Sequence, residues 1–269
     1  MNQNELVTII KLHQMKKSGE KISVLTSYDA SFTQRIENSG CEVILVGDSL
    51  GMVVQGKEST VPVTMTEMIY HTSMVRRASN NCLVIADLPF LSYATENLAL
   101  KNAGKLMKQC GAHMVKLEGG AVRLNIVKIL SDNSIPVCAH LGLLPQSIHK
   151  LGAYKVQGRD NSQAESILND ALALQQAGAD LLVLECVPTS LASKITSRLD
   201  IPVIGIGAGV ECDGQVLVLY DMLGITTGKR PRFSKDFLLE SNGSIQTAIN
   251  NYVVAVRESR FPADEHSYK

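Results

Sequence analysis

The sequence predicts a single (β/α)8 (TIM) barrel with N-terminal and C-terminal helical additions, spanning residues 1–269 as one domain. Its length lies within the range of one α/β barrel. Eight short apolar runs alternate with longer segments of helical period. Most runs are apolar on successive residues, which is typical of parallel strands buried on both faces. A doubly wound sheet is the alternative, because a count of strands does not prove closure.

The eight expected strands have lengths common among strands of globular proteins. In chain order they cover residues 23–29, 43–49, 83–88, 114–118, 137–141, 181–187, 203–208 and 215–220. Between them, residues 96–110 and 163–177 repeat apolar side chains at helical spacing. Gly111 and Gly178 follow these two segments, where glycine suits a left-handed cap.

A terminal helical region is expected after a loop at residues 229–233. Its apolar residues form one stripe, made of Ile245, Ala248, Ile249, Tyr252, Val253 and Val256. Such a stripe must be buried, either against the barrel or against a neighbouring subunit. Both alternatives are consistent with the sequence.

Composition argues against several classes of function. The chain has 26 basic and 26 acidic side chains, so no excess of cations is present to bind nucleic acid or an anionic membrane. No apolar leader follows Met1 and no run of about 18 apolar residues occurs. We therefore expect a cytoplasmic protein with no membrane partner. The six cysteines are scattered, with no Cys-x-x-Cys pair, and are expected to be buried thiols.

Polar residues end several of the apolar runs, and the active site of a βα barrel forms at the C-terminal ends of its strands. Asp48, Asp87, Glu118, His140 and Glu185 occupy such positions. The first three offer carboxylate oxygens without a thiolate or histidine cluster, which favours Mg²⁺ with several retained waters. For each residue alone, a helix cap or an acceptor for loop amides is the alternative.

Three further polar residues have less specific signals. Lys116 lies two residues before Glu118, so strand alternation directs both side chains to one side of the sheet. It is expected to pair with an anionic substrate, and a Schiff-base lysine or a structural ion pair are the alternatives. Glu185, within an apolar run, is a candidate general base or one half of a buried ion pair. His140 by itself indicates little.

Glycines and long connections complete the expected site. Residues 205–209 read Gly-Ile-Gly-Ala-Gly, which predicts a tight turn first and a loop that contacts a ligand second. Residues 51–64 and 143–160 are long for barrel connections. On the catalytic face such loops are often lids or binding segments that exclude water.

Eight segments together carry a specific pattern: GDSLGM (47–52), YHT (70–72), DLPF (87–90), MVKLEGG (114–120), HLGL (140–143), YKVQGR (154–159), LECVP (184–188) and GIGAG (205–209). In number, order and spacing they resemble the ketopantoate hydroxymethyltransferase (3-methyl-2-oxobutanoate hydroxymethyltransferase) family over nearly the whole chain. Leu144 and Ala153 stand where that family is expected to have Thr and Gly. Neither residue is a proposed chemical group.

The resemblance implies a barrel of the phosphoenolpyruvate mutase and isocitrate lyase superfamily. It implies a reaction of pantothenate, and hence coenzyme A, biosynthesis. In that reaction 5,10-methylenetetrahydrofolate donates a one-carbon unit to 3-methyl-2-oxobutanoate, giving 2-dehydropantoate. The family is Mg²⁺-dependent, with Mn²⁺ or Co²⁺ possible, and is typically a homodecamer.

Matched position by position, the resemblance implies a role for each residue of the expected site. Asp48 and Asp87 match the metal ligands, and Glu118 matches a further carboxylate of the metal site. Ser49, Asp87 and Lys116 match the contacts to the oxo acid, Glu185 matches the base, and His140 matches an active-site histidine of open role.

Chelation of the 2-oxo acid by Mg²⁺ would acidify its C3 proton, and the resulting enolate would be stabilised by the metal and Lys116. Two other functions remain as alternatives. One is another Mg²⁺-dependent lyase or mutase of 2-oxo acids in the same superfamily. The other is a barrel that binds ligands without catalysis.

Overall fold

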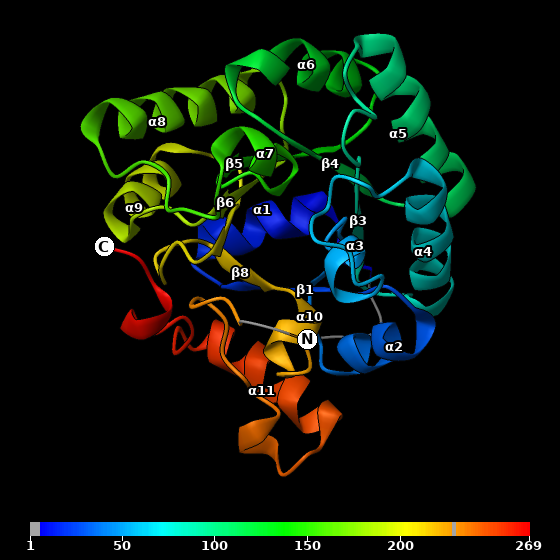
Figure 1. Cartoon of the computed structure of the whole chain (residues 1–269), viewed down its shortest axis with the longest axis vertical. Helices are drawn as coiled ribbons and strands as arrows, with labels where there is room; N and C mark the ends of the chain where they lie inside the picture. The colour runs from blue at the N-terminus through cyan, green and yellow to red at the C-terminus, as the bar shows by residue number, and fades with distance from the viewer. Residues whose placement is uncertain (1–5, 228–229) are drawn as a thin grey trace.

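Eight strands close into a barrel in the computed structural model, which describes residues 6–227 and 230–269. They are β1 (Ile22–Thr26), β2 (Val43–Val46), β3 (Leu83–Asp87), β4 (Met114–Glu118), β5 (Val137–Gly142), β6 (Leu181–Glu185), β7 (Val203–Ile206) and β8 (Gly214–Leu217). Each strand pairs in parallel with the next, and β8 pairs with β1 (Figure 1). The predicted barrel is confirmed, and the doubly wound alternative is wrong.

All eight expected strands exist, but several expected runs extend past the end of their strand. Val187, Ala208 and Leu219 were expected in strands and instead lie in loops or, for Leu219, in a short helix. All three are fully buried. Because the loops at this end of the barrel also cover the core, apolar residues continue beyond the last strand hydrogen bond. Apolar character therefore overestimates the strand length.

Helices surround the barrel on the outside (Figure 1). The longer ones are α1 (Ile9–Ser18), α2 (Ala30–Asn38), α4 (Met65–Ala78), α5 (Glu96–Cys110), α6 (Leu124–Asp132), α8 (Asn161–Gln176), α9 (Thr189–Arg198) and α11 (Ile245–Arg257). The short ones are α3 (Leu50–Val53), α7 (Ile148–Leu151) and α10 (Leu219–Met222). The strand–helix alternation is interrupted once, because residues 207–213 join β7 directly to β8 without a helix.

The predicted helix at 96–110 is confirmed with the same bounds, and Gly111 caps it in the left-handed conformation at φ +75°. The helix predicted at 163–177 covers Asn161–Gln176 instead. It begins earlier because Asp160 caps it, accepting a hydrogen bond from the amide of Gln163 at 2.8 Å. Gly178 has φ +104° and follows the helix by two residues.

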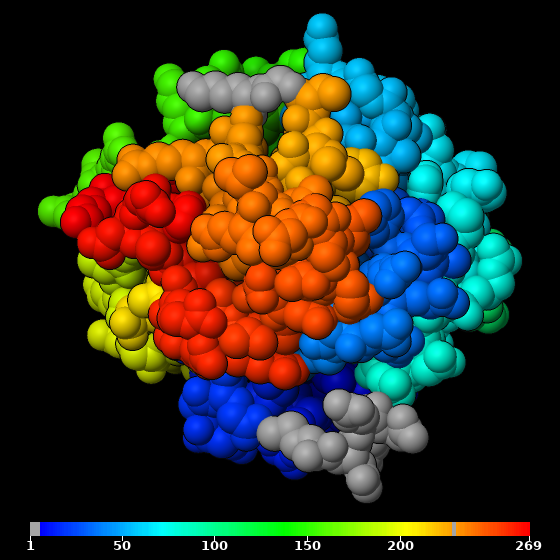
Figure 2. All heavy atoms as spheres, turned by 90° about the horizontal axis from the view of Figure 1, so that it is seen from below, coloured from blue at the N-terminus to red at the C-terminus, as the bar shows by residue number. Residues whose placement is uncertain are grey.

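The terminal helix α11 packs on its own barrel. Its apolar stripe is buried except for Ile245 at the start of the helix, which is exposed, and the Tyr252 hydroxyl lies 2.9 Å from the carbonyl oxygens of both Val24 and Gln215, on β1 and β8. Figure 2 shows the outer side of α11 against the helix α2. Of the two alternatives for this stripe, burial on the barrel is confirmed. Of the expected loop at 229–233, residue 229 lies outside the described residues, and residues 230–233 contain no helix or strand.

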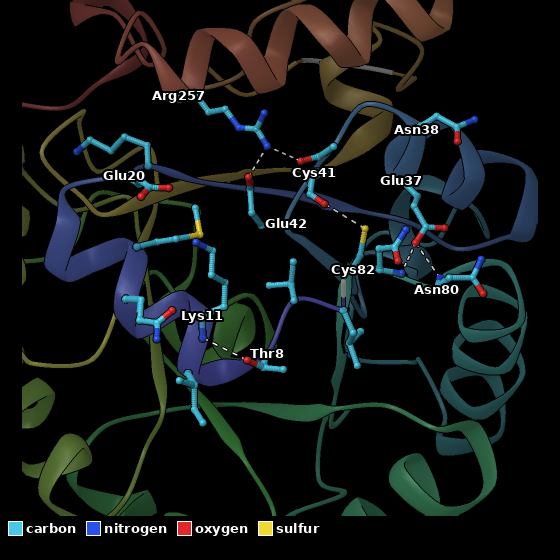
Figure 3. Close-up of a pocket in the computed structure, with 18 residues that line it drawn as sticks. Thr8, Lys11, Glu20, Glu37, Asn38, Cys41, Glu42, Asn80, Cys82 and Arg257 are labelled. Carbon is cyan, nitrogen blue, oxygen red and sulfur yellow. Dashed lines mark hydrogen bonds and ion pairs between the residues drawn. The ribbon is translucent and has the colours of Figure 1, made fainter. Parts of the chain in front are cut away.

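The helix α1 lies at the N-terminal end of the barrel, where Lys16 forms an ion pair of 2.6 Å with Asp213. A cavity of about 1240 Å³ opens between α1, α2, the entries of β2 and β3, and the end of α11 (Figure 3). Its acidic side chains already have partners: Glu42 pairs with Arg257, Glu37 accepts from the amides of Asn80 and Asn81, and Glu20 accepts from the hydroxyl of Ser18. In βα barrels this end serves stability rather than catalysis.

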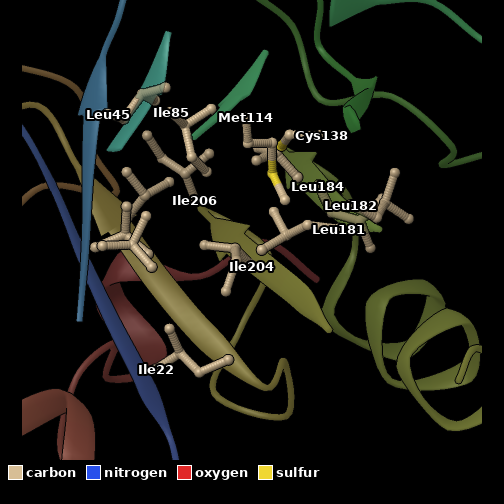
Figure 4. Packing of buried hydrophobic residues seen from close by; sticks show 14 of the residues in the cluster. Ile22, Leu45, Ile85, Met114, Cys138, Leu181, Leu182, Leu184, Ile204 and Ile206 are labelled. Carbon is tan, nitrogen blue, oxygen red and sulfur yellow. The ribbon is translucent and has the colours of Figure 1, made fainter. Parts of the chain in front are cut away.

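The interior of the barrel is filled with apolar side chains. Residues such as Leu45, Ile85 and Ile204 meet across it (Figure 4). The space left there is only about 10 Å³, no more than a water molecule occupies. Lys116 also lines this space, so β4 directs this side chain into the barrel, as strand alternation predicts.

Two smaller expectations are also tested by the fold. All six cysteines are free and buried, as predicted. The glycine string at 205–209 is a tight turn, with Gly207 at φ +60° and Gly209 at φ +93°. A Cβ on Gly209 would lie 2.5 Å from Cγ2 of Thr189, so this turn packs closely against the start of α9. Within residues 6–227 and 230–269, no helix has the length and apolar character needed to cross a membrane.

Candidate active site

The structure brings the predicted polar residues together at the C-terminal mouth of the barrel. Asp87, Glu118 and Glu185 are the last residues of β3, β4 and β6, and Asp48 lies two residues after β2. His140 lies within β5. Parallel strands of one closed sheet end at the same rim, which is why residues far apart in sequence converge here. Asp48, Asp87 and Glu118 are all buried.

Asp87 links two strands of the mouth. Its Oδ1 accepts a hydrogen bond from Nζ of Lys116 at 2.8 Å, and its Oδ2 accepts one from the backbone amide of Asp48 at 3.1 Å. The register of the sheet places Asp87 directly opposite Lys116. The carboxylates of Asp87 and Asp48 therefore face one region rather than separate ones.

Three acidic side chains at the mouth lie around a single lysine. Asp48, Asp87 and Glu118 share one buried ammonium, that of Lys116. Burial, and then the carboxylates of Asp87 and Glu118, raise the pKa of Asp48 well above its ordinary value. Burial alone would lower the pKa of Lys116, but Asp87, Glu118 and Asp48 outweigh it and raise that pKa. Lys116 stays protonated, which argues against the Schiff-base alternative and leaves charge pairing.

His140 lies between two carboxylates. Its Nδ1 is 3.6 Å from Oε1 of Glu118, and its Nε2 is 3.2 Å from Oε2 of Glu185. Burial would lower the pKa of His140, but Glu118 and Glu185 beside the ring raise it to about 9. Neither contact is a hydrogen bond, so both ring nitrogens of His140 and Oε1 of Glu118 are buried without a hydrogen-bond partner.

Ser49 lies at the start of α3, and its Oγ is 2.9 Å from the hydroxyl of Tyr28. Tyr28 follows β1 and is buried, and burial raises the pKa of its phenol, so it stays protonated. The sequence analysis missed Tyr28 as a neighbour of the site. A signal was present, because residue 28 falls inside an expected strand run and near its C-terminal end.

Gln146 and Tyr93 are two further residues that the sequence analysis missed. Gln146 donates from Nε2 to Oδ2 of Asp48 at 2.8 Å, and its backbone amide donates to Oε2 of Glu118 at 3.0 Å. The Tyr93 hydroxyl accepts from the amide of Glu118 at 3.2 Å. Both residues lie in loops beyond the strand ends, where no pattern of period or spacing identifies them.

The long loop at 143–160 lies over the mouth. Tyr154 of this loop is half exposed, and its hydroxyl is 3.7 Å from Sδ of Met52 on the other expected long loop. Burial raises the pKa of Tyr154, with further contributions from Glu185, Asp48 and Glu118, which places its ring near these carboxylates. The two long loops therefore meet beside the acidic cluster.

The donor set at the mouth fits a hard divalent cation that retains water. Within the described part of the chain, no three His, Cys, Asp or Glu side chains are arranged to enclose a metal ion. Mg²⁺, however, is usually held by only one or two carboxylates together with waters and substrate. Asp48 and Asp87 provide such a pair, and the unpartnered Oε1 of Glu118 is a further buried acceptor.

Comparison with known proteins identifies similar sequences over nearly the whole chain. The sequence pattern of the ketopantoate hydroxymethyltransferase family matches residues 6–264. The 3-methyl-2-oxobutanoate hydroxymethyltransferase of Nitrosococcus oceani is 58% identical over 262 residues, which cover 97% of this chain and 99% of the relative.

Solved structures share the architecture at much lower identity. Phosphoenolpyruvate phosphomutase from Streptomyces platensis superposes with a TM-score of 0.62 at 15% identity, covering 94% of both chains. Phosphonopyruvate hydrolase in complex with oxalate and Mg²⁺ superposes with a TM-score of 0.61 at 11% identity, covering 98% of this chain and 100% of the other. These likenesses show the fold alone, a closed (β/α)8 barrel.

Proposed function

The chain belongs to the ketopantoate hydroxymethyltransferase family, and we propose that it transfers the one-carbon unit of 5,10-methylenetetrahydrofolate to 3-methyl-2-oxobutanoate. The product is 2-dehydropantoate, and the reaction is the first step of pantothenate biosynthesis. One observation carries the proposal: in a chain similar to hydroxymethyltransferases throughout, the barrel mouth gathers Asp48, Asp87 and Glu118 around the ammonium of Lys116.

Asp48 and Asp87 are the residues that would hold the divalent cation, with Glu118 accepting from its waters. When bound, Mg²⁺ polarises the keto group of the oxo acid and acidifies the adjacent C3–H bond. Lys116 is protonated and held at 2.8 Å from Asp87, so it is placed to attract an anionic substrate and to stabilise negative charge. Ser49, whose Oγ is 2.9 Å from the Tyr28 hydroxyl, offers a further hydroxyl to the oxo acid.

Glu185 is the proposed base. Its carboxylate is the least buried of the acidic group, with 13% of the side chain exposed, so it lies at the edge that a substrate reaches. It takes the C3 proton of the oxo acid, and the electron pair of the broken C–H bond makes C3 nucleophilic. C3 then forms a bond to the methylene carbon of the folate, and both C–N bonds of that carbon break. Water supplies the hydroxyl of the hydroxymethyl group, and its remaining proton and the proton taken by Glu185 pass to the two folate nitrogens. Nε2 of His140 lies 3.2 Å from this carboxylate, and a protonated His140 would attract it.

The test is an assay of the purified protein with Mg²⁺, 3-methyl-2-oxobutanoate and 5,10-methylenetetrahydrofolate, with detection of 2-dehydropantoate. Product that depends on all three additions supports the proposal. Turnover of phosphonopyruvate instead would favour a lyase or mutase, and binding of the oxo acid without turnover would favour the non-catalytic alternative. Replacement of Mg²⁺ by Mn²⁺ or Co²⁺ in the same assay identifies the metals that support the reaction.

We also propose that the chain assembles with copies of itself, as a decamer by resemblance to its family. Sedimentation equilibrium measures the mass of the particle, and a mass near 29.1 kDa would contradict assembly.

A further inference from the structure

The segment after β5 inserts one buried glutamine among the acidic residues of the mouth. Gln146 lies in a turn of 3₁₀ helix at Pro145–Ser147, at the start of the long loop 143–160. It is 5% exposed although it belongs to a loop. Three of its polar groups make hydrogen bonds to four different residues, two of which are carboxylates of the candidate site.

The orientation of the Gln146 amide follows from the chemistry of its neighbours. The carbonyl oxygen of Leu88 can only accept, so the amide atom 3.0 Å from it must be Nε2. The Tyr93 hydroxyl already accepts from the amide of Glu118, so its proton is free to be donated to Oε1 of Gln146. The second proton of Nε2 therefore points to Oδ2 of Asp48 at 2.8 Å.

The same residue also holds Glu118. Its backbone amide donates to Oε2 of Glu118 at 3.0 Å, which leaves Oε1 of Glu118 as the oxygen without a hydrogen-bond partner. Gln146 thus binds one oxygen of Asp48 and one oxygen of Glu118, and it fixes how each carboxyl group is turned; the other oxygen of Glu118 faces Nδ1 of His140 at 3.6 Å without a hydrogen bond. A buried donor between two like charges also reduces their repulsion.

We infer that Gln146 is a positioning residue, which fixes the carboxylates of Asp48 and Glu118 toward the oxo acid and its cation and fastens the long loop to them. The inference deepens the proposed function and rests on it. Groups that orient metal-binding carboxylates typically change metal affinity or activity by 10- to 100-fold when they are replaced. The side chain of Gln146 touches no reacting atom in this role, so its loss acts on binding before it acts on the chemical step.

The test compares Gln146→Leu with Gln215→Leu. Gln215 is equally buried, at 3% exposure, and donates to the carbonyl oxygen of Gly209, but it contacts none of the mouth carboxylates. Binding of Mn²⁺ is measured by the loss of the electron paramagnetic resonance signal of the free ion. Steady-state kinetics give KM and kcat for the oxo acid, and thermal unfolding gives the midpoint temperature. We expect Gln146→Leu to raise the Kd of Mn²⁺ and the KM at least tenfold, with a smaller change in kcat. Gln215→Leu lowers the thermal midpoint alone.

A folded Gln146→Leu protein with wild-type Kd and KM overturns the inference. If that variant does not fold, Tyr93→Phe provides the decision, because it keeps the ring and removes the hydroxyl that orients the amide of Gln146 and accepts from the backbone amide of Glu118. An increase of about two- to fivefold in the Kd of Mn²⁺ then supports the inference, and no increase overturns it. Wild-type protein that binds Mn²⁺ but neither binds nor converts the oxo acid contradicts the proposed function instead, while the Mn²⁺ comparison still tests Gln146.

Discussion

Each carboxylate at the mouth of the barrel is placed by a group from a different strand or loop. Asp87 is held by Lys116 and by the amide of Asp48, and Asp48 in turn is held by Gln146. Buried carboxylates without such partners would be costly, since desolvation disfavours the charged form. The cluster therefore exists only because several elements supply donors to it, and single substitutions are expected to have distinct effects.

Replacement of Glu185 by Gln is expected to lower kcat by about 10²- to 10⁴-fold, because the amide cannot take the C3 proton. Steady-state kinetics with the oxo acid and the folate measure it. Glu165→Gln is the matched control: Glu165 lies on the surface of α8 in an exposed pair with Lys194 at 2.8 Å. A near-normal kcat for Glu185→Gln would remove this residue from the mechanism.

Replacement of Asp87 by Asn is expected to abolish oxo-acid binding that depends on Mg²⁺, because one of the two paired carboxylates loses its charge while its size is kept. Calorimetric titration with the oxo acid, in the presence and absence of Mg²⁺, measures this. Asp213→Asn serves as the control, since Asp213 also pairs with a lysine but at the other end of the barrel. Unchanged affinity in the Asp87 variant would refute the ligand role.

The elements around the barrel are begun and ended by local chemistry. The helix α4 starts with a capping box, in which Thr64 and Glu67 exchange hydrogen bonds between side chains and backbone. Oε2 of Glu67 accepts from the amide of Thr64 at 2.7 Å. Gln55 and Lys57 of the loop after α3 also bind this carboxylate, so one residue joins the start of α4 to a loop near the mouth.

A pH-dependent contribution to stability is expected from Glu67. The backbone hydrogen bond from Thr64 is the largest cause that lowers the pKa of Glu67 from 4.5 to about 2. A carboxylate with a lowered pKa in the folded state stabilises the protein above its unfolded pKa, and this contribution is lost as the pH falls toward the folded pKa. The difference in the free energy of unfolding between wild type and Glu67→Gln should therefore be largest near pH 7 and decrease as the pH falls from 4.5 to 2.

Urea unfolding of both proteins across this pH range measures the difference. Glu58→Gln is the control, because Glu58 is exposed in the same region and has no hydrogen bond or ion pair among the described contacts. A Glu67→Gln difference that does not change with pH would show that the capping carboxylate contributes nothing through its charge.

The molecule as a whole depends on closure of the sheet between β8 and β1. Ile22 lies opposite Gly214 at this seam, and a Cβ on Gly214 would lie 2.3 Å from the carbonyl oxygen of Ile22. This carbonyl oxygen belongs to the backbone of a paired strand, so it cannot move away from the added Cβ as the end of a flexible side chain could. The absence of a side chain at residue 214 therefore lets the first and last strands approach to hydrogen-bonding distance.

Gly214→Ala is expected to destabilise the protein by about 1–3 kcal/mol, the usual cost of overpacking. Gly104→Ala is the matched control. Gly104 lies in α5 with nothing near its Cβ position, so the same change should stabilise by about 0.4–1 kcal/mol. The free energy of unfolding in urea measures both. Equal effects of the two substitutions would show that the seam tolerates a side chain.

The sequence by itself determined the eight strands, three of the helices and the polar residues at strand ends. These features are visible in short stretches of sequence. A strand that is buried on both faces is apolar along its length, and a polar residue marks the point where it reaches the mouth of the barrel. Asp87, Glu118 and Glu185 could be found for this reason. The eight sequence segments listed above indicated the family, and hence the activity expected of it, because their order along the chain is visible without any structure.

Only the tertiary structure decided which groups surround these residues. The hydrogen bond from Gln146 to Asp48 joins positions 98 residues apart. The direct connection from β7 to β8 and the burial of α11 on its own barrel likewise depend on distant parts of the chain. A hydrogen bond between two loops leaves no periodic trace in either of them. Partners of this kind are therefore fixed by how the closed sheet brings its loops together.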